Sequence, residues 1–438
     1  MVSIMPAMPA HSGALYTAEQ VRDLERRAID ELGIPGYQLM TRAGHATLDA
    51  LRALWPAAKS IAVLCGPGNN GGDGYVVARV ARAQGLRTEV FFLDDPRQLR
   101  ADARQAHADF VAAGGHCRPW RGEPLDVDVI VDALFGTGLT REHSGEAAEL
   151  LCAANAAQRP IVAVDIPSGL HADSGAVLGV AARAALPVTF IGRKLGFYLG
   201  EGPEHVGRLV CDDLGVPPET YSIVTASASL LAESDVVAAL PRRGRLVHKG
   251  SHGHVLVIGG GPGMPGAARL AGEAALRAGA GLVTVAVHPD NLGIVAERPE
   301  LMCTAARSAR DLAAVLARAT VVAIGPGLGT DVWGRGQLEA ALGSGLPLIV
   351  DADALNLIAE RPRASDHWVL TPHPGEAARL LGSTGRAVQA DRLAAARELQ
   401  ARCGGHVVLK GAGSIVQSPG DVPRICDRGN PGMAAGGM

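Results

Sequence analysis

The chain has 438 residues, more than one ordinary hydrophobic core holds, so two or three domains are expected. Its composition, 47% apolar and 19% charged with a net charge of −3, suits a compact globular protein and argues against nucleic acid or a membrane surface as a partner. No segment reaches the roughly 18 apolar residues of a membrane span, and residues 1–12 lack the basic start of a secretion signal. Seven scattered cysteines without a CxxC pair predict reduced, buried thiols and a cytoplasmic protein.

Elements of the first half follow an alternating pattern. A helix is expected from Thr17, where Thr17 and Gln20 form a capping box, and a second helix from Tyr37 to Leu54. Helices are also expected over Tyr75–Gln84 and Arg97–Ala113. Short apolar runs between the helices predict buried parallel strands at Ile61–Cys65, Val90–Leu93, Val127–Val131, Ile161–Val164 and Val188–Ile191.

A less regular segment, residues 219–240, predicts a linker that ends in a short helix. A second α/β series then begins, and its glycine-rich turns differ from those of the first half, which indicates two different domains and not a duplication. Its strands are expected at Val255–Ile258, Leu282–Val287, Val321–Ile324, Leu348–Val350, Trp368–Leu370 and Val407–Leu409.

Three strand ends in the first half carry polar residues beside glycine. They are the run from Gly66 to Gly74 (GPGNNGGDG), the run from Asp132 to Leu139 (DALFGTGL) and the run from Asp165 to Gly169 (DIPSG). In open α/β sheets, ligands bind outside the carboxyl ends of the strands, so the three loops are expected to converge on one crevice. Each run alone could be a helix cap or a tight turn without a ligand.

These three motifs, in this order and at these intervals, resemble the NAD(P)H-hydrate epimerase family over roughly residues 15–218. The resemblance implies inversion of the hydroxyl-bearing carbon of hydrated NADH or NADPH, with Asp132 as the first acid/base candidate and Asp165 as the second. It implies a K⁺ site of oxygen ligands at Asn70, Asp132 and Ser168. The substrate contacts that it implies are Asn69, Asn70, Gly71, Gly72, Asp73, Gly136, Thr137, Gly138, Leu139, Thr140, Arg141, Glu142 and Asp165.

The second half also places glycine-rich and polar motifs after its strands. Gly259–Ala268 and Gly325–Gly329 are runs of small residues, and His373 lies between two prolines in TPHPGE. Lys410 opens the turn KGAGS, where a Lys among small residues suits phosphate contact. The last segment, from Gly429 (GNPGMAAGGM), is a glycine-rich turn of the kind that offers amide groups to phosphate.

These motifs resemble the ADP/ATP-dependent NAD(P)H-hydrate dehydratases, a ribokinase-like family, over residues 240–438. The resemblance implies hydrate contacts at Ala267, Gly327 and His373, with Mg²⁺ accompanying ADP or ATP. The nucleotide contacts that it implies are Lys410, Gly411, Ala412, Gly413, Ser414 and Gly437. In the family, the pattern continues with Gly-Asp and closing helices, so the sequence predicts an incomplete domain with weak or absent dehydration.

The sequence therefore predicts two three-layer α/β domains. Residues 1–218 form a Rossmann-like epimerase domain, 219–240 a linker, and 241–438 a ribokinase-like dehydratase domain that lacks its last helices. Two other hypotheses stay open: a phosphotransferase acting on a small alcohol, and a non-enzymatic scaffold or ligand sensor. The oligomeric state, a homo-oligomer included, and the choices between ADP and ATP and between NADH and NADPH hydrate are left open.

Overall fold

The structure is a computed structural model that describes residues 13–240 and 242–434. The described chain divides between Ser229 and Leu230 into two compact units, and each is described by itself. Both units alternate strands with helices around a mainly parallel sheet. The expected α/β fold class is confirmed.

The first unit is built on a parallel sheet in the order β4-β3-β2-β5-β6-β7-β9. Its strands are β2 (Ser60–Cys65), β3 (Arg87–Phe92), β4 (Cys117–Pro119), β5 (Val129–Ala133), β6 (Ile161–Val164), β7 (Leu186–Phe190) and β9 (Val210–Asp212). Its helices are α1 (Ala18–Asp30), α2 (Gly36–Leu54), α3 (Asn69–Ala83), α4 (Ala101–Ala112), α5 (Glu146–Ala156) and α6 (Gly202–His205). The short strand β1 (Ala14–Tyr16) pairs in parallel with β8 (Arg193–Lys194) and antiparallel with β10 (Ala228–Leu230).

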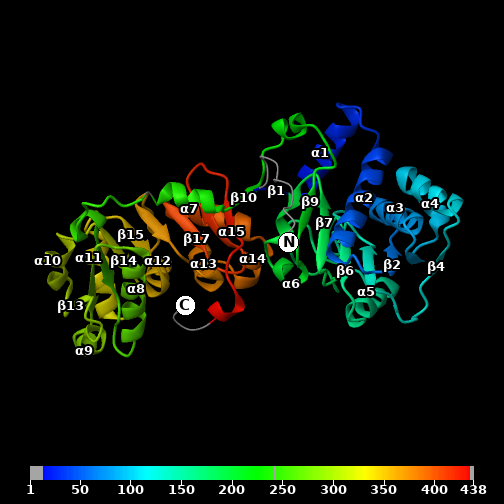
Figure 1. Ribbon diagram of the computed structural model, residues 1–438. Coiled ribbons are helices and arrows are strands. Elements are labelled where there is room, and N and C mark those ends of the chain that lie inside the picture. The colour runs from blue at the N-terminus through cyan, green and yellow to red at the C-terminus, as the bar shows by residue number, and fades with distance from the viewer. Residues whose placement is uncertain (1–12, 241, 435–438) are drawn as a thin grey trace. The chain divides into compact units, whose positions relative to one another are not determined.

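Helices cover both faces of this sheet. Successive residues of a strand point to opposite sides, and in β2 the residues on both sides are apolar and need to be buried. Val63 and Cys65 of β2 pack with residues of α2, α3 and α4, whereas Ala62 and Leu64 pack with Leu150 and other residues of α5. Figure 1 shows α2, α3 and α4 together on one side of the strands and α5 on the other. The central strands β2, β5, β6 and β7 are buried on both faces, as their apolar runs predict.

Local signals placed the first helix correctly, but the start of α3 differs from the prediction. Thr17 caps α1 in the expected box with Gln20. Helix α3 begins at Asn69, so the glycine-rich run forms its first turns and not a loop before it. Glycine disfavours helices, yet close packing requires it here, because a Cβ on Gly71 would lie 2.0 Å from the Gly66 carbonyl oxygen. Tertiary contact therefore overrides local propensity at this point.

In the second unit the strands follow the order β13-β12-β11-β14-β15-β16-β17-β18-β19. Strand β18 pairs antiparallel with both of its neighbours, β17 and β19. They are β11 (His254–Ile258), β12 (Leu282–Val287), β13 (Met302–Ala305), β14 (Val321–Ile324), β15 (Leu348–Val350), β16 (Trp368–Leu370), β17 (His406–Leu409), β18 (Ser414–Gln417) and β19 (Arg424–Cys426). The helices are α7 (Glu233–Ala239), α8 (Pro265–Ala278), α9 (Leu292–Ala296), α10 (Ala313–Leu316), α11 (Val332–Leu342), α12 (Ala352–Glu360), α13 (Pro374–Leu381), α14 (Gly385–Ala390) and α15 (Arg392–Cys403).

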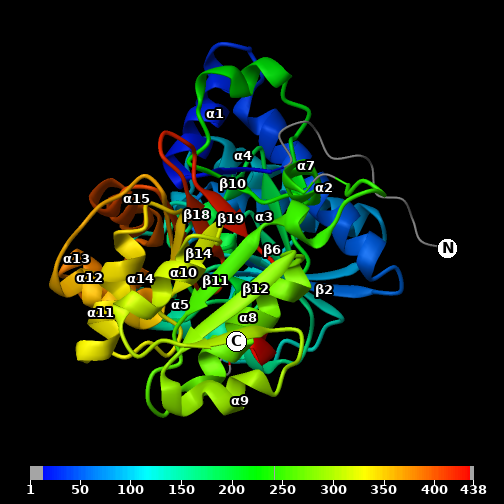
Figure 2. The ribbon, with the colours of Figure 1, turned by 90° about the vertical axis from the view of Figure 1, so that its left-hand side faces the viewer.

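The core of this unit also lies on both faces of its sheet. Val257 and Val283 pack against Ala268 of α8 and Val295 of α9, and Figure 2 shows these two helices close to β11 and β12. Leu256 and Ile258 alternate with Val257 and are completely buried, so the opposite face is covered as well. The predicted motifs follow the carboxyl ends of the parallel strands of this sheet.

Several sequence expectations need comment. Residues 219–240, expected to be a linker, contain β10 and α7. The cysteines are all free, but only Cys65 and Cys403 are buried, and Cys152 is exposed, so the prediction of buried thiols is wrong for most of them. Among the described residues, no helix is long and apolar enough to cross a bilayer.

Candidate active sites

The first candidate site lies at the switch point of the N-terminal sheet, where the strand order reverses between β2 and β5. The loops after these strands touch, because the Gly66 amide donates to the Ala133 carbonyl at 3.0 Å. A Cβ on Gly66 would lie 1.7 Å from the Leu134 carbonyl oxygen. Strand β6 pairs with β5 in parallel, so its carboxyl end joins the same edge. The three predicted loops therefore meet on one side of one sheet.

Asp132 lies in β5 and is locked to Ser168 from the loop after β6. The Ser168 amide donates to Asp132 Oδ2 at 2.8 Å, and the Ser168 hydroxyl donates to Oδ1 at 2.6 Å. Both side chains are completely buried. Burial raises the pKa of Asp132 to about 6, although the hydrogen bonds from Ser168 and Leu134 act to lower it.

Asp165 follows β6 and pairs with Lys194, the last residue of β8. Lys194 Nζ donates to Asp165 Oδ1 and, at 2.7 Å, to the Thr189 hydroxyl. The Lys194 side chain is completely buried, whereas that of Asp165 is 16% exposed. Asp165 also adopts a left-handed φ of +68°, a conformation that costs energy for a residue with a Cβ. The loop therefore holds the carboxylate at the crevice against a local preference.

The helix that opens the crevice contributes two polar side chains. Asp73 is half-buried in α3, and its pKa lies well above the usual range because of burial first and the nearby charges of Asp165 and Glu25 second. Asn70 is buried, and its amide nitrogen has no hydrogen-bond partner in the described chain. A Cβ on Gly136 would lie 3.3 Å from the Asn70 Oδ1 atom, so the helix start and the loop after β5 are in close contact.

The remaining predicted contacts lie in the loop that leaves β5. Residues 136–142 are exposed or half-buried there. At the start of α3, Asn69 is exposed, whereas Gly71 and Gly72 are buried. Three residues beside them were not predicted to contact substrate: Lys194, Thr189 and His143. His143 packs its ring 5.4 Å from that of Phe135, and both of its ring nitrogens are buried without a partner. None of the three belongs to a motif named in the sequence analysis, so the sequence alone gave no reason to choose them.

The second candidate site lies at the carboxyl ends of the parallel strands in the C-terminal unit. Strand β11 pairs with β14, followed by β15, β16 and β17, all in parallel. The loops interlock, since the Lys410 amide donates to the Pro372 carbonyl at 2.9 Å. A Cβ on Gly325 would lie 1.7 Å from the Asp351 carbonyl oxygen. The predicted motifs after these strands therefore share one edge.

Asp351 joins two of these loops. Its Oδ1 atom accepts from Lys410 Nζ at 2.7 Å and from the Thr371 hydroxyl at 2.9 Å. Both Asp351 and Lys410 are partly exposed, with 31% and 41% of their side chains accessible. The pair thus presents a carboxylate and an ammonium at the edge where a phosphate and a cation would meet.

The three residues expected to contact the hydrate differ in what surrounds them. Ala267 and Gly327 are neighbours, because a Cβ on Gly327 would lie 3.2 Å from Ala267 Cβ. His373 caps α13: its Nδ1 atom accepts from the Gly375 amide at 2.9 Å, and its Nε2 atom lies 3.3 Å from Glu376 Oε1. The imidazole is therefore held in place and half exposed.

The expected nucleotide contacts Lys410, Gly411, Ala412, Gly413 and Ser414 lie at the junction of β17 and β18. Gly411 and Gly413 both have positive φ values, +141° and +67°. The left-handed conformation is accessible to glycine without strain, which explains both glycines of this turn. Gly437, the remaining expected contact, lies outside the described residues.

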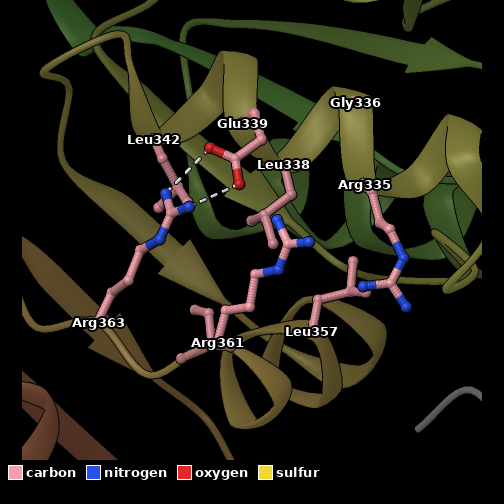
Figure 3. Close-up of a pocket in the computed structure, with 9 residues that line it drawn as sticks. Arg335, Gly336, Leu338, Glu339, Leu342, Leu357, Arg361 and Arg363 are labelled. Atoms are coloured by element: carbon pink, nitrogen blue, oxygen red, sulfur yellow. Dashed lines mark hydrogen bonds and ion pairs between the residues drawn. The ribbon is translucent and has the colours of Figure 1, made fainter.

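A cavity of about 160 Å³ between α11 and α12 contains none of the predicted residues. Figure 3 shows its arginines, of which Arg363 forms a two-fold ion pair with Glu339. Arg335 pairs with Glu360 at 2.7 Å. Leu338, Leu342 and Leu357 line the same space. This cavity is separate from the strand-end residues and plays no part in the sites described above.

The folds and strand-end crevices define a two-domain α/β enzyme whose sites suit anionic, phosphate-bearing ligands. Residues 36–196 match the family described as "YjeF-related protein N-terminus", and residues 255–438 match "NAD(P)H-hydrate dehydratase". A bifunctional NAD(P)H-hydrate repair enzyme of Coxiella burnetii is 48% identical over 97% of this chain and 87% of its own length. The Escherichia coli enzyme of the same description is 43% identical over 97% of this chain and 82% of its own. The chain belongs to the family of bifunctional NAD(P)H-hydrate repair enzymes.

Among solved structures, the second half is similar to an ADP/ATP-dependent NAD(P)H-hydrate dehydratase from Bacillus subtilis. That chain is 31% identical, with 48% of this chain and 76% of that one covered and a TM-score of 0.43. The family assignment confirms the enzyme class expected from the sequence, a repair enzyme with an isomerase domain and a lyase domain.

Proposed function

We propose that the N-terminal crevice epimerises hydrated NADH and NADPH, and that the C-terminal crevice dehydrates the S-hydrate at the expense of ADP or ATP. This replaces the weak or absent dehydration expected from the sequence, because relatives 48% and 43% identical over 97% of this chain are bifunctional repair enzymes. In this proposal, residues 1–218 and 241–438 are the two catalytic domains, joined by residues 219–240. One observation carries the first half of the proposal: Asp132 at the end of β5, Asp165 directly after β6 and Asn70 in the first turn of α3 lie at the same edge of one sheet, at its switch point.

The epimerisation requires a group that moves a proton as the hydroxyl leaves one face of the ring and returns on the other. Asp165 suits this role better than Asp132, because Asp132 is buried and both of its oxygens accept hydrogen bonds from Ser168. Asp165 is partly exposed at the crevice, and the ion pair with Lys194 orients it. Asp73, whose pKa is raised by burial, adds a second carboxyl group on the neighbouring helix. We assign the proton transfer to Asp165, and orientation of the loops to Asp132.

A K⁺ ion suits the residues expected to hold it. Asn70, Asp132 and Ser168 offer amide, carboxylate and hydroxyl oxygens, the donors that hard cations prefer. The buried Asn70 amide nitrogen lacks an acceptor in the described chain, and as a donor it fits an oxygen of the substrate while its Oδ1 atom faces the ion. No three His, Cys, Asp or Glu side chains cluster as metal ligands within the described residues, so a transition metal is not the natural occupant. When bound, K⁺ would offset the negative charge of Asp132 and of the substrate phosphates.

In the C-terminal crevice, the turn 410–414 would receive the nucleotide phosphates, with Lys410 as the positive charge. Asp351, which accepts a hydrogen bond from Lys410, would hold the Mg²⁺ that accompanies the nucleotide. Ala267 and Gly327 have small side chains that leave room for the hydrate, and His373 lies at the end of the neighbouring strand β16. Phosphorylation of the hydroxyl makes it a far better leaving group than hydroxide.

Two assays on the purified chain test the two halves separately. Chromatography of a single purified epimer should show its conversion to the R/S mixture without nucleotide. Absorbance of reduced nicotinamide should rise when the S-hydrate is mixed with the chain, Mg²⁺ and ADP or ATP. Failure of interconversion would refute the N-terminal assignment, and failure of NADH formation would refute the C-terminal one.

A further inference from the structure

The buried guanidinium of Arg392 lies behind the turn 410–414. Arg392 is the first residue of α15 and is only 3% exposed. One of its terminal nitrogens donates to three carbonyl oxygens, those of Leu409 at 3.3 Å, Lys410 at 3.2 Å and Gly413 at 3.3 Å. A single side chain therefore holds both ends of the turn.

These bonds fix the direction in which the turn presents its amides. In a trans peptide the C=O and N–H groups point to opposite sides, and the described chain contains no cis peptide. Because the carbonyls of Leu409 and Lys410 point at Arg392, the amides of Lys410 and Gly411 point away from it. The Lys410 amide then reaches the Pro372 carbonyl, which fixes the turn beside the end of β16. The Ala412 and Gly413 amides have no acceptor within the described residues.

The sequence of the turn is adapted to this contact. A Cβ on Gly411 would lie 2.9 Å from both terminal nitrogens of Arg392, closer than a side chain tolerates. The absence of a side chain at Gly411 therefore leaves room for the guanidinium and also allows the positive φ of this residue. The second terminal nitrogen donates to Gln389 Oε1 at 2.7 Å, and the Nε atom is buried without a partner.

The charge of Arg392 is also not neutralised by a neighbour. No carboxylate of the described chain lies within ion-pair distance of the guanidinium, whose hydrogen-bond acceptors are neutral oxygens. Burying an unpaired charge is costly, so the site is more stable when an anion lies nearby. The Lys410 and Gly411 amides already donate to the Pro372 carbonyl and, at 3.3 Å, to the Ser414 hydroxyl. A phosphate beside the Ala412 and Gly413 amides would supply that anion, on the turn that the guanidinium holds.

From these contacts we propose that Arg392 is a positioning residue for nucleotide binding: it shapes the turn 410–414 and supplies a buried positive charge to the phosphates. The inference rests on the proposed nucleotide-dependent function of this crevice. Arg392 touches the turn and not the reacting atoms, so it should affect nucleotide affinity selectively. The KM for the hydrate should change little.

The test uses the full chain and the variants Arg392→Gln and Arg392→Lys, with Arg386→Gln as a matched control. Arg386 is an exposed arginine of the neighbouring helix α14. Calorimetric affinity for ADP and ATP, and the KM values for nucleotide and S-hydrate, are measured in each. Loss of a charged hydrogen bond predicts that Arg392→Gln weakens nucleotide binding by roughly 10-fold or more. Arg392→Lys keeps the charge and should be intermediate, and Arg386→Gln should match the wild type.

Epimerisation by the same preparations, together with thermal unfolding, reports whether each variant has folded. A folded Arg392→Gln variant with wild-type nucleotide affinity would overturn the proposal, as would equal losses of nucleotide and hydrate affinity. If Arg392→Gln fails to fold, Arg392→Lys decides: an unchanged KM for nucleotide overturns the proposal, and a selective rise supports it. A wild-type chain that binds no nucleotide would instead refute the proposed function of the crevice, and the inference with it.

A double variant adds an independent check. Gly411→Ala places a methyl group against the guanidinium and should weaken nucleotide binding by itself. If both residues act through one contact, Arg392→Gln combined with Gly411→Ala should lose clearly less than the product of the two single losses. Fully multiplicative losses would contradict a shared role.

Discussion

Lys194 donates a hydrogen bond from its buried ammonium to the carboxylate of Asp165, 29 residues earlier in the chain. This ion pair joins the loop after β6, which carries Asp165, to the segment after β7, which carries Lys194. Asp73 and Glu25 lie near enough to the pair to interact with it electrostatically. Lys194 is therefore the cation that allows several carboxyl groups to gather there.

Replacing Lys194 with Met should destabilise the N-terminal unit by about 3 kcal/mol, because it leaves the Asp165 charge without its partner. Replacing Asp165 with Asn in the same chain should restore much of that loss, since the amide carries no charge. Urea unfolding of both single variants and the double variant measures this coupling. Additive losses in the cycle would show that the two side chains do not interact.

The protonation of Asp73 should appear in the pH dependence of stability. Its pKa in the folded protein is raised, so its contribution to stability is fully present below its ordinary pKa and is lost as pH rises through the raised value. Asp73→Asn, which cannot ionise, should remove that loss. The difference in free energy of unfolding between the variant and wild type should grow with pH, by at most about 1.4 kcal/mol per pH unit. A difference that is flat across this range would contradict the raised pKa.

Binding of K⁺ should depend on the ionisation of Asp132. Without the ion, its raised pKa of about 6 means that the contribution of Asp132 to stability is lost as pH rises through that value. K⁺ binds the ionised form, so the stabilisation by K⁺ should be small well below that pKa and larger above it, of order 1–3 kcal/mol at saturating ion. Thermal unfolding with KCl, compared with a lithium salt at equal ionic strength, measures it. Asp132→Asn should abolish the pH-dependent part; an equal effect of both salts would argue against a specific site.

Gly66 and Gly68 provide a matched pair for the contact between the loops. A Cβ on Gly66 would overlap the Leu134 carbonyl oxygen, whereas nothing lies within 4 Å of a Cβ on Gly68. Gly66→Ala should cost about 1–3 kcal/mol or more of stability and slow epimerisation. Gly68→Ala, at the N-cap of α3, should cost only a few tenths of a kcal/mol. Equal unfolding midpoints for the two variants would show that the loops after β2 and β5 do not need this approach.

The strands could be predicted because buried parallel strands appear in the sequence as apolar runs. The polar residues that follow them could be predicted as site residues because ligands bind at the carboxyl ends of such strands. The start of α3 at Asn69 could not, since packing of Gly71 against the Gly66 carbonyl outweighs the poor helix propensity of glycine. β5 also begins two residues later than expected, at Val129. Its shift places Asp132 inside the strand, where burial raises its pKa.

The contacts made by side chains distant in sequence were the hardest to foresee. The ion pair of Lys194 with Asp165 is one of them, because nothing in the sequence links the two residues. Arg392 precedes the turn 410–414 by a whole helix and belongs to no motif. Such pairs depend on how the helices and strands pack against one another, and the local pattern of a single sequence does not reveal this packing.

The most direct test of the account is the rate at which a purified R-hydrate is converted to the S-hydrate by wild type and by Asp165→Asn. Asp165→Asn keeps the size of the side chain, so the account predicts a folded variant whose rate falls at least roughly 100-fold, the scale of a lost acid/base group. A folded Asp165→Asn variant that interconverts the epimers at the wild-type rate would contradict the assignment of proton transfer to this crevice residue.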